Sequence, residues 1–189
     1  MRPRWIGLLA AAALCGSSAS LPAEGPDVGE LTRELTGEKP AAKRTAGQLD
    51  AAYAKVLDAL MGDLGNEDIP KRDRAQRTLE RIAFQASRPG ADADRAACAK
   101  ALAGRLGPDV PTPARAWILR QIERLGRAEV VAPLAKALGD KDALVRESAR
   151  RALEKNPSRQ AGEALGKAIA SAAAPAWRAA LVNALVDRP

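Results

Sequence analysis

One short phrase returns along the chain and constrains the fold more than any other feature. It consists of a leucine, three residues, a second leucine and a glycine, and its fourth copy has isoleucine for the second leucine and lacks the glycine. The copies begin at residues 60, 102, 134 and 165, so the intervals are 42, 32 and 31 residues. A period of this size indicates a stack of helical or strand units, each too small to bury its own apolar face.

The composition favours helices over strands for these units. The 189-residue chain is 47% hydrophobic but only 3% aromatic. Alanine and leucine, both strong helix formers, make up most of the apolar set, and the residues that favour strands are scarce. We therefore predict an all-α fold, a right-handed α-solenoid of about four helix pairs.

Helical periodicity begins at Thr45, which together with Gln48 resembles a capping box. Gly65 then indicates the end of a helix, and Thr112, Asp142 and Ser158 indicate helix starts. The predicted helices are about 45–64, 68–86, 92–106, 112–125, 127–138, 142–154, 158–171 and 175–187. They form one repeat domain over residues 45–189.

Residues 1–20 have the three parts of an export signal: a basic start, an apolar run and a stretch of small residues. Cleavage is expected after Ala19 or Ser20, and the apolar run is too short for a comfortable membrane span. The mature chain is then periplasmic or extracellular and has no membrane span. Two alternatives stay open, a lipid-modified Cys15 and an uncleaved signal anchor.

Residues 21–44 combine prolines and glycines with charges and few apolar side chains. This composition is typical of a flexible linker, and it leaves room for one short helix around Val28 to Leu35.

The residue inventory predicts no catalytic residue, no cofactor and no metal ligand set. Histidine, the commonest general base and metal ligand, is absent from the sequence. If the signal is removed, Cys98 is the only cysteine left, and we expect it to be a small buried helix residue.

The stretch from Asp142 to Leu153 reads Asp-x-x-Val-Arg-x-x-Ala-x-x-Ala-Leu and resembles the HEAT repeat, especially the short bacterial kind related to phycobilisome lyases. Partial copies occur elsewhere in the domain, with Trp177 in the valine place and Leu119 in the arginine place. The residues that keep the pattern are Asp68, Arg72, Ala75, Leu79, Ile118, Ile122, Arg178, Ala184 and Leu185. The resemblance implies stacked helix pairs, in which Arg146 could pair with an acidic residue of the next repeat. It does not select a function, because this architecture hosts scaffolds, adaptors, lyases and glycosylases.

The second helices of these pairs carry arginines that would line a concave face. They are Arg74, Arg77, Arg81, Arg120, Arg124, Arg146 and Arg150. With a net charge of +7, they predict either a basic ribbon for an acidic partner or a solvated surface of self-paired charges. Trp117 and Trp177 are likewise expected to pack between repeats or to anchor a partner.

The last predicted helix bears Leu181 and Leu185 but no clear polar outer face, which a terminal repeat normally has. A partner, a second copy or further repeats of a longer protein would cover it. We predict a non-enzymatic scaffold that binds an unidentified protein partner. The alternatives are binding of a polyanion, with nucleic acid disfavoured by export, and a remnant of a HEAT-like lyase or DNA glycosylase.

Overall fold

The computed structural model describes residues 27–189, so the predicted signal at 1–20 lies outside the described residues. Within that range the fold consists of nine α-helices and one short 3-10 helix, without strands, which confirms the all-α prediction. The elements are α1 (Val28–Leu35), α2 (Ala46–Leu64), α3 (Ile69–Ala86), α4 (Asp92–Ala103), α5 (Thr112–Leu125), η1 (Ala128–Val130), α6 (Val131–Ala137), α7 (Ala143–Lys155), α8 (Arg159–Ser171) and α9 (Pro175–Val186).

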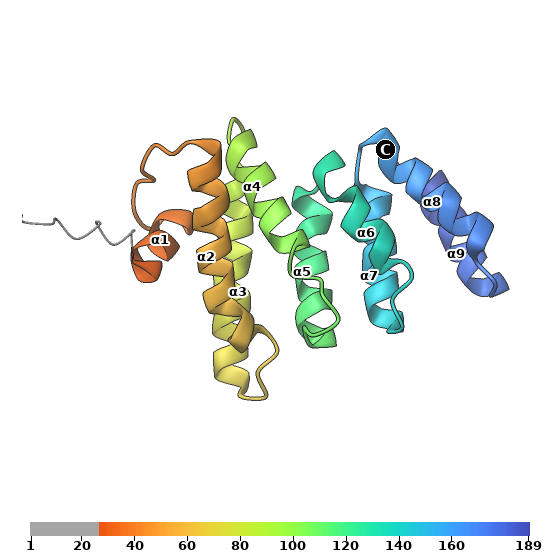
Figure 1. Cartoon of the computed structure of the whole chain (residues 1–189), viewed down its shortest axis with the longest axis horizontal. Helices are drawn as coiled ribbons and strands as arrows, with labels where there is room; N and C mark the ends of the chain where they lie inside the picture. Colours follow the sequence, from red (N-terminus) through yellow and green to blue (C-terminus); the bar gives the residue numbers. More distant parts are fainter. Residues whose placement is uncertain (1–26) are drawn as a thin grey trace, which may run out of the picture.

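From α2 onward the helices follow one another as four consecutive pairs along an elongated molecule (Figure 1). Each pair packs internally, α2 on α3, α4 on α5, α6 on α7 and α8 on α9. Neighbouring pairs meet through equivalent helices. The second row consists of α3, α5, α7 and α9, which contact one another in succession. The first row consists of α2, α4, α6 and α8. In this row α2 contacts α4 and α6 contacts α8, whereas α4 contacts the η1 turn before α6.

The helices of both rows share one continuous cluster of buried side chains, mostly leucine, isoleucine and alanine. Leu79, Ile118 and Leu153 are fully buried in it, and Val145 is 1% exposed. Each such side chain contributes about 1.5–3 kcal/mol relative to exposure. Buried alanines such as Ala149 let neighbouring helices approach closely.

Most of the predicted helix starts are confirmed. Thr45 and Gln48 form the capping box, in which Thr45 Oγ1 accepts from the Gln48 N–H at 3.4 Å and Gln48 Oε1 accepts from the Thr45 N–H at 2.9 Å. Asp142 caps α7 by accepting from the Leu144 N–H at 2.9 Å. Ser158 lies at the N-cap of α8 but caps nothing, since its hydroxyl donates to Asn156 Oδ1 at 2.7 Å.

The structure describes residues 27–44 of the expected flexible linker. Its short helix α1 has the predicted bounds, but it packs against α2 and α3 and buries Leu31 and Leu35. The side chains of Glu34 and Arg44 form an ion pair in which both are only 8% exposed. Two leucines one turn apart therefore suffice to dock this segment, although its overall apolar content is low.

An arginine recurs four residues after the N-cap position of every second-row helix, at Arg72, Arg115, Arg146 and Arg178. Three of them donate to a carbonyl oxygen six residues earlier, in the joint before the helix. The pairs are Arg72 with Asn66 (3.1 Å), Arg146 with Asp140 (2.8 Å) and Arg178 with Ala172 (2.6 Å). The expected pairing of Arg146 with an acid of the next repeat is wrong, because its guanidinium is used within its own joint.

Arg115 makes such a cross-repeat pair instead. In the second repeat, Arg115 therefore occupies the arginine position of the pattern, and the prediction that put Leu119 there is wrong. Its side chain is 3% exposed and its Nη1 donates to Asp140 in the next joint. Helix α5 begins at Thr112, as predicted, and the Thr112 hydroxyl donates to Asp142 Oδ2 at 3.0 Å. The second and third pairs are thereby joined by a buried polar link.

Candidate binding groove

The structure distributes the seven predicted arginines over α3, α5 and α7 but gives them different surroundings. Arg77 pairs with Asp73 at 3.9 Å, and Arg81 pairs with Glu38 at 2.7 Å. Arg150 bonds to both Glu147 and Glu154 at 2.6 Å. The Arg150 guanidinium lowers the pKa of Glu147. These side chains behave as the self-paired surface predicted as the alternative.

Arg74, Arg120 and Arg124 have no carboxylate partner within ion-pair distance in the described part of the chain. Arg146, the seventh, bonds to joint carbonyls and stacks over the ring of Trp177 at 6.0 Å. The ribbon is therefore interrupted, and its four arginines without a carboxylate partner lie on α3, α5 and α7.

A groove of about 730 Å³ crosses the second row at this place. We call it the α5 groove. Its walls come from α3, α5 and α7, and its lining consists of Gln76, Glu80, Pro113, Ala116, Trp117, Arg120, Gln121, Glu123, Arg124, Leu144, Ser148 and Arg151. A second hollow of about 610 Å³ shares Glu80 and Arg124 with it and adds Arg77, Arg81 and the exposed ring of Phe84.

Two polar atoms in the lining of the α5 groove are buried without a hydrogen-bond partner. They are the indole Nε1 of Trp117, a donor, and the amide Oε1 of Gln121, an acceptor. Gln121 is 1% exposed. Leaving one such group unsatisfied costs about 1–3 kcal/mol, so this arrangement is destabilising unless something supplies partners.

The charges around these two atoms are predominantly positive. Arg120, Arg124 and Arg151 line the groove, against Glu80 and Glu123. The Arg120 guanidinium lies 5.3 Å from the centre of the Trp117 ring. Trp117 is half-buried, so it both packs against the core and faces the groove.

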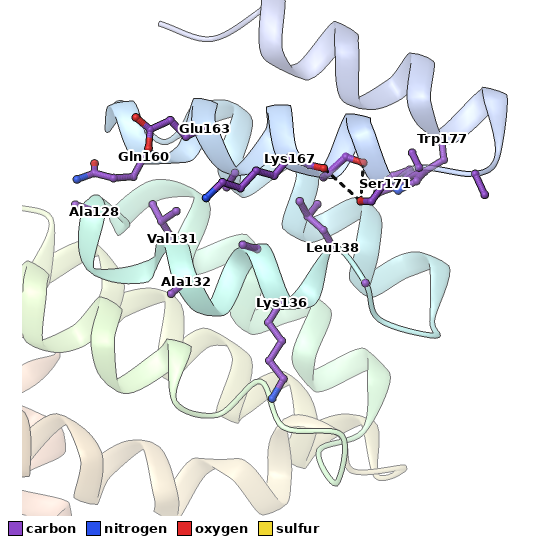
Figure 2. Close-up of a pocket in the computed structure, with 16 residues that line it drawn as sticks. Ala128, Val131, Ala132, Lys136, Leu138, Gln160, Glu163, Lys167, Ser171 and Trp177 are labelled. Atoms are coloured by element: carbon purple, nitrogen blue, oxygen red, sulfur yellow. Dashed lines mark hydrogen bonds between the residues drawn. The ribbon is translucent and has the colours of Figure 1, made fainter.

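A larger groove of about 780 Å³ lies on the first row, between α6 and α8 (Figure 2). Its walls are mainly alanines, its rim carries Lys136 and Lys167, and Trp177 stands at one end. The hydroxyl of Ser171 donates to the carbonyl oxygens of Lys167 and Ala168 within its own helix. None of the unpartnered buried polar atoms found in residues 27–189 lines this groove. It is thus a weaker candidate for a specific site.

The remaining chemically reactive groups are structural. Cys98 is fully buried, which raises the pKa of its thiol to about 12 and keeps it from forming a nucleophilic thiolate. Tyr53 donates to Asp94 Oδ1 at 3.0 Å, and burial raises its pKa as well. The described residues contain no cluster of three or more metal-ligand side chains. Glu80 and Glu123 line the α5 groove together with the half-buried Trp117.

Comparison with protein-family models finds no match, and comparison with curated proteins finds none either. Among residues 27–189, the helices are all too short or too polar to span a bilayer.

The sequence prediction found Trp117, Arg120 and Arg124 but missed Gln121. The signal was present: Gln121 lies six residues after Arg115, where the third and fourth repeats have Ala152 and Ala184. The first repeat has Thr78 at this position, so Gln121 is the longest side chain that the four repeats place there.

Proposed function

We propose that the chain is a non-enzymatic scaffold that binds a protein partner through the α5 groove. Its helix pairs would be HEAT-like and stacked as a right-handed α-solenoid. The succession of pairs and the recurring arginine that bonds to its own joint support this proposal. Export to the cell envelope or beyond is part of the same proposal and rests on the pattern of residues 1–20.

One observation carries the assignment of the groove. Two side chains that line the same hollow as three arginines carry a buried unpartnered donor and a buried unpartnered acceptor. A protein partner can supply hydrogen-bond acceptors, donors and carboxylates together, whereas water or small ions satisfy only part of the set.

The test is a pull-down from envelope extract with the purified chain as bait, at low and high salt. The double variant Arg120→Glu with Arg124→Glu reverses two exposed charges in the groove. The matched control, Lys136→Glu with Lys167→Glu, makes the same change in charge at the first-row groove. We expect one specific protein to be retained at high salt by the wild type and the control and lost from the arginine variant. Retention by the arginine variant would refute the assignment.

Polyanion binding is the second candidate, and the unneutralised charge of Arg74, Arg120 and Arg124 favours it. A polyanion would be held by phosphate or carboxylate contacts alone, so its affinity would fall steeply as salt rises. Binding that does not change with salt would exclude this candidate.

A further inference from the structure

The two unpartnered atoms of the α5 groove belong to side chains one helical turn apart. Trp117 and Gln121 are residues i and i+4 of α5, so they project from the same face of the helix. One offers a hydrogen and the other a lone pair. A peptide unit carries the complementary set, one C=O and one N–H.

We propose that the α5 groove binds an acidic peptide segment, one of whose backbone amides bonds to Trp117 and Gln121 while its carboxylates pair with Arg120, Arg124 and Arg151. This inference rests on the proposed function and names the chemistry of the partner. The peptide carbonyl accepts from Trp117 Nε1, and a peptide N–H donates to Gln121 Oε1. Both atoms are shielded from water in the free chain, so side chains around them have to shift when the peptide binds.

The same contacts disfavour a phosphate of a nucleic-acid backbone at this position. Phosphate oxygens accept hydrogen bonds but do not donate, so a phosphate at this position would face the Gln121 oxygen with no hydrogen between them. Glu80 and Glu123 also interrupt the basic lining. A peptide with spaced carboxylates can avoid these two acids, whereas a strand with a charge on every nucleotide meets them.

The test follows the indole N–H signal of Trp117 in ¹H–¹⁵N NMR spectra of the full chain. The signal is assigned by its loss in the Trp117→Phe variant. The probes are poly-L-glutamate, polyacrylate with a matched number of carboxylates but no peptide groups, and a single-stranded oligo-dT of equal charge. We expect poly-L-glutamate to shift the indole signal and polyacrylate to leave it in place.

Gln121→Met keeps the length of the side chain and removes the acceptor. We expect it to weaken poly-L-glutamate binding about fivefold, the effect of one hydrogen bond, and to leave polyacrylate binding unchanged. Gln160→Met, in the first-row groove, is the control and should alter neither.

Three outcomes would overturn the inference. An unchanged affinity of Gln121→Met for poly-L-glutamate would show that no peptide N–H bonds to the Gln121 side chain. Tighter binding of oligo-dT with the same indole shift would assign the groove to nucleic acid. Poly-L-glutamate binding that Arg120→Glu with Arg124→Glu abolishes, without an indole shift, would refute the backbone contact and leave the groove as the protein-binding surface tested by pull-down.

Discussion

The buried link between Arg115 and Asp140 gives the sharpest prediction about stability. Asp140→Asn removes the charge that neutralises a guanidinium only 3% exposed. Removing one partner of a buried ion pair costs about 3–5 kcal/mol, because the other charge is left uncompensated. Asp140 is itself 17% exposed and the amide can still accept one bond, so we expect the lower end, about 3 kcal/mol.

Thermal unfolding followed by circular dichroism measures this loss. For a chain of this size each kcal/mol corresponds to about 2–4 °C, so the midpoint should fall by about 6–12 °C. Asp73→Asn is the control, since it breaks a more exposed pair with Arg77 at 3.9 Å and should change the midpoint by little.

A double-mutant cycle separates the pair from its surroundings. Arg115→Met alone should also destabilise, and the double variant Arg115→Met with Asp140→Asn should recover part of the loss, because no unpaired charge stays buried. A midpoint for Asp140→Asn equal to that of the control, or strictly additive effects in the cycle, would refute the account of a buried link between repeats.

Two further predictions concern α1 and acidity. Leu31→Ala with Leu35→Ala should cost about 4 kcal/mol in urea unfolding, whereas the exposed Arg33→Ala should cost almost nothing; an equal effect of the two changes would show that α1 is not docked. The pKa of Asp140 is lowered by the Asp142 N–H and by Arg115, and the pKa of Asp142 by the Thr112 hydroxyl. Both carboxylates therefore stabilise the fold above their unfolded pKa, near 4, and this contribution disappears as pH falls through the lower folded values. Urea midpoints from pH 6 to pH 2 should show wild type and Asp140→Asn converging at the acid end, and a constant difference would contradict this origin.

The helix boundaries were predictable because their signals are local. Thr45 with Gln48, and Asp142 with the backbone that follows it, satisfy the N–H groups of their own first turn, so sequence alone identifies them. The docking of α1 was not predictable in the same way. Leu31 and Leu35 become buried only because α2 and α3 present a surface for them, which is a property of the tertiary fold.

The residues of the α5 groove could be predicted only in part, because some of their contacts depend on the tertiary fold. Arg120 and Arg124 are recognisable by type and position, whereas the pairing of Arg81 depends on Glu38, which lies just after α1. Gln121 was missed because the second repeat was aligned with Leu119 as its arginine. Once Arg115 takes that position, Gln121 falls where the other repeats have the smaller side chains of Thr78, Ala152 and Ala184, and the difference is visible in the sequence.

The junction between the first helix pair (α2 and α3) and the second (α4 and α5) is held differently in the two rows. On the first row, Arg105 of the α4 end bonds to Asp58 at 2.6 Å and to the Ala54 carbonyl at 2.7 Å, and Lys100 bonds to Asp50 at 2.6 Å. Between α3 and α5, by contrast, the described residues include no cross-helix hydrogen bond or ion pair, only packing. Polar bonds thus hold the junction together on the side of α2 and α4, whereas the opposite side, at the α5 groove, is held by packing alone. Because no polar bond joins α3 to α5, we expect a small change in the angle between them to alter the width of the α5 groove at low energetic cost, which would let the groove admit partners of different thickness.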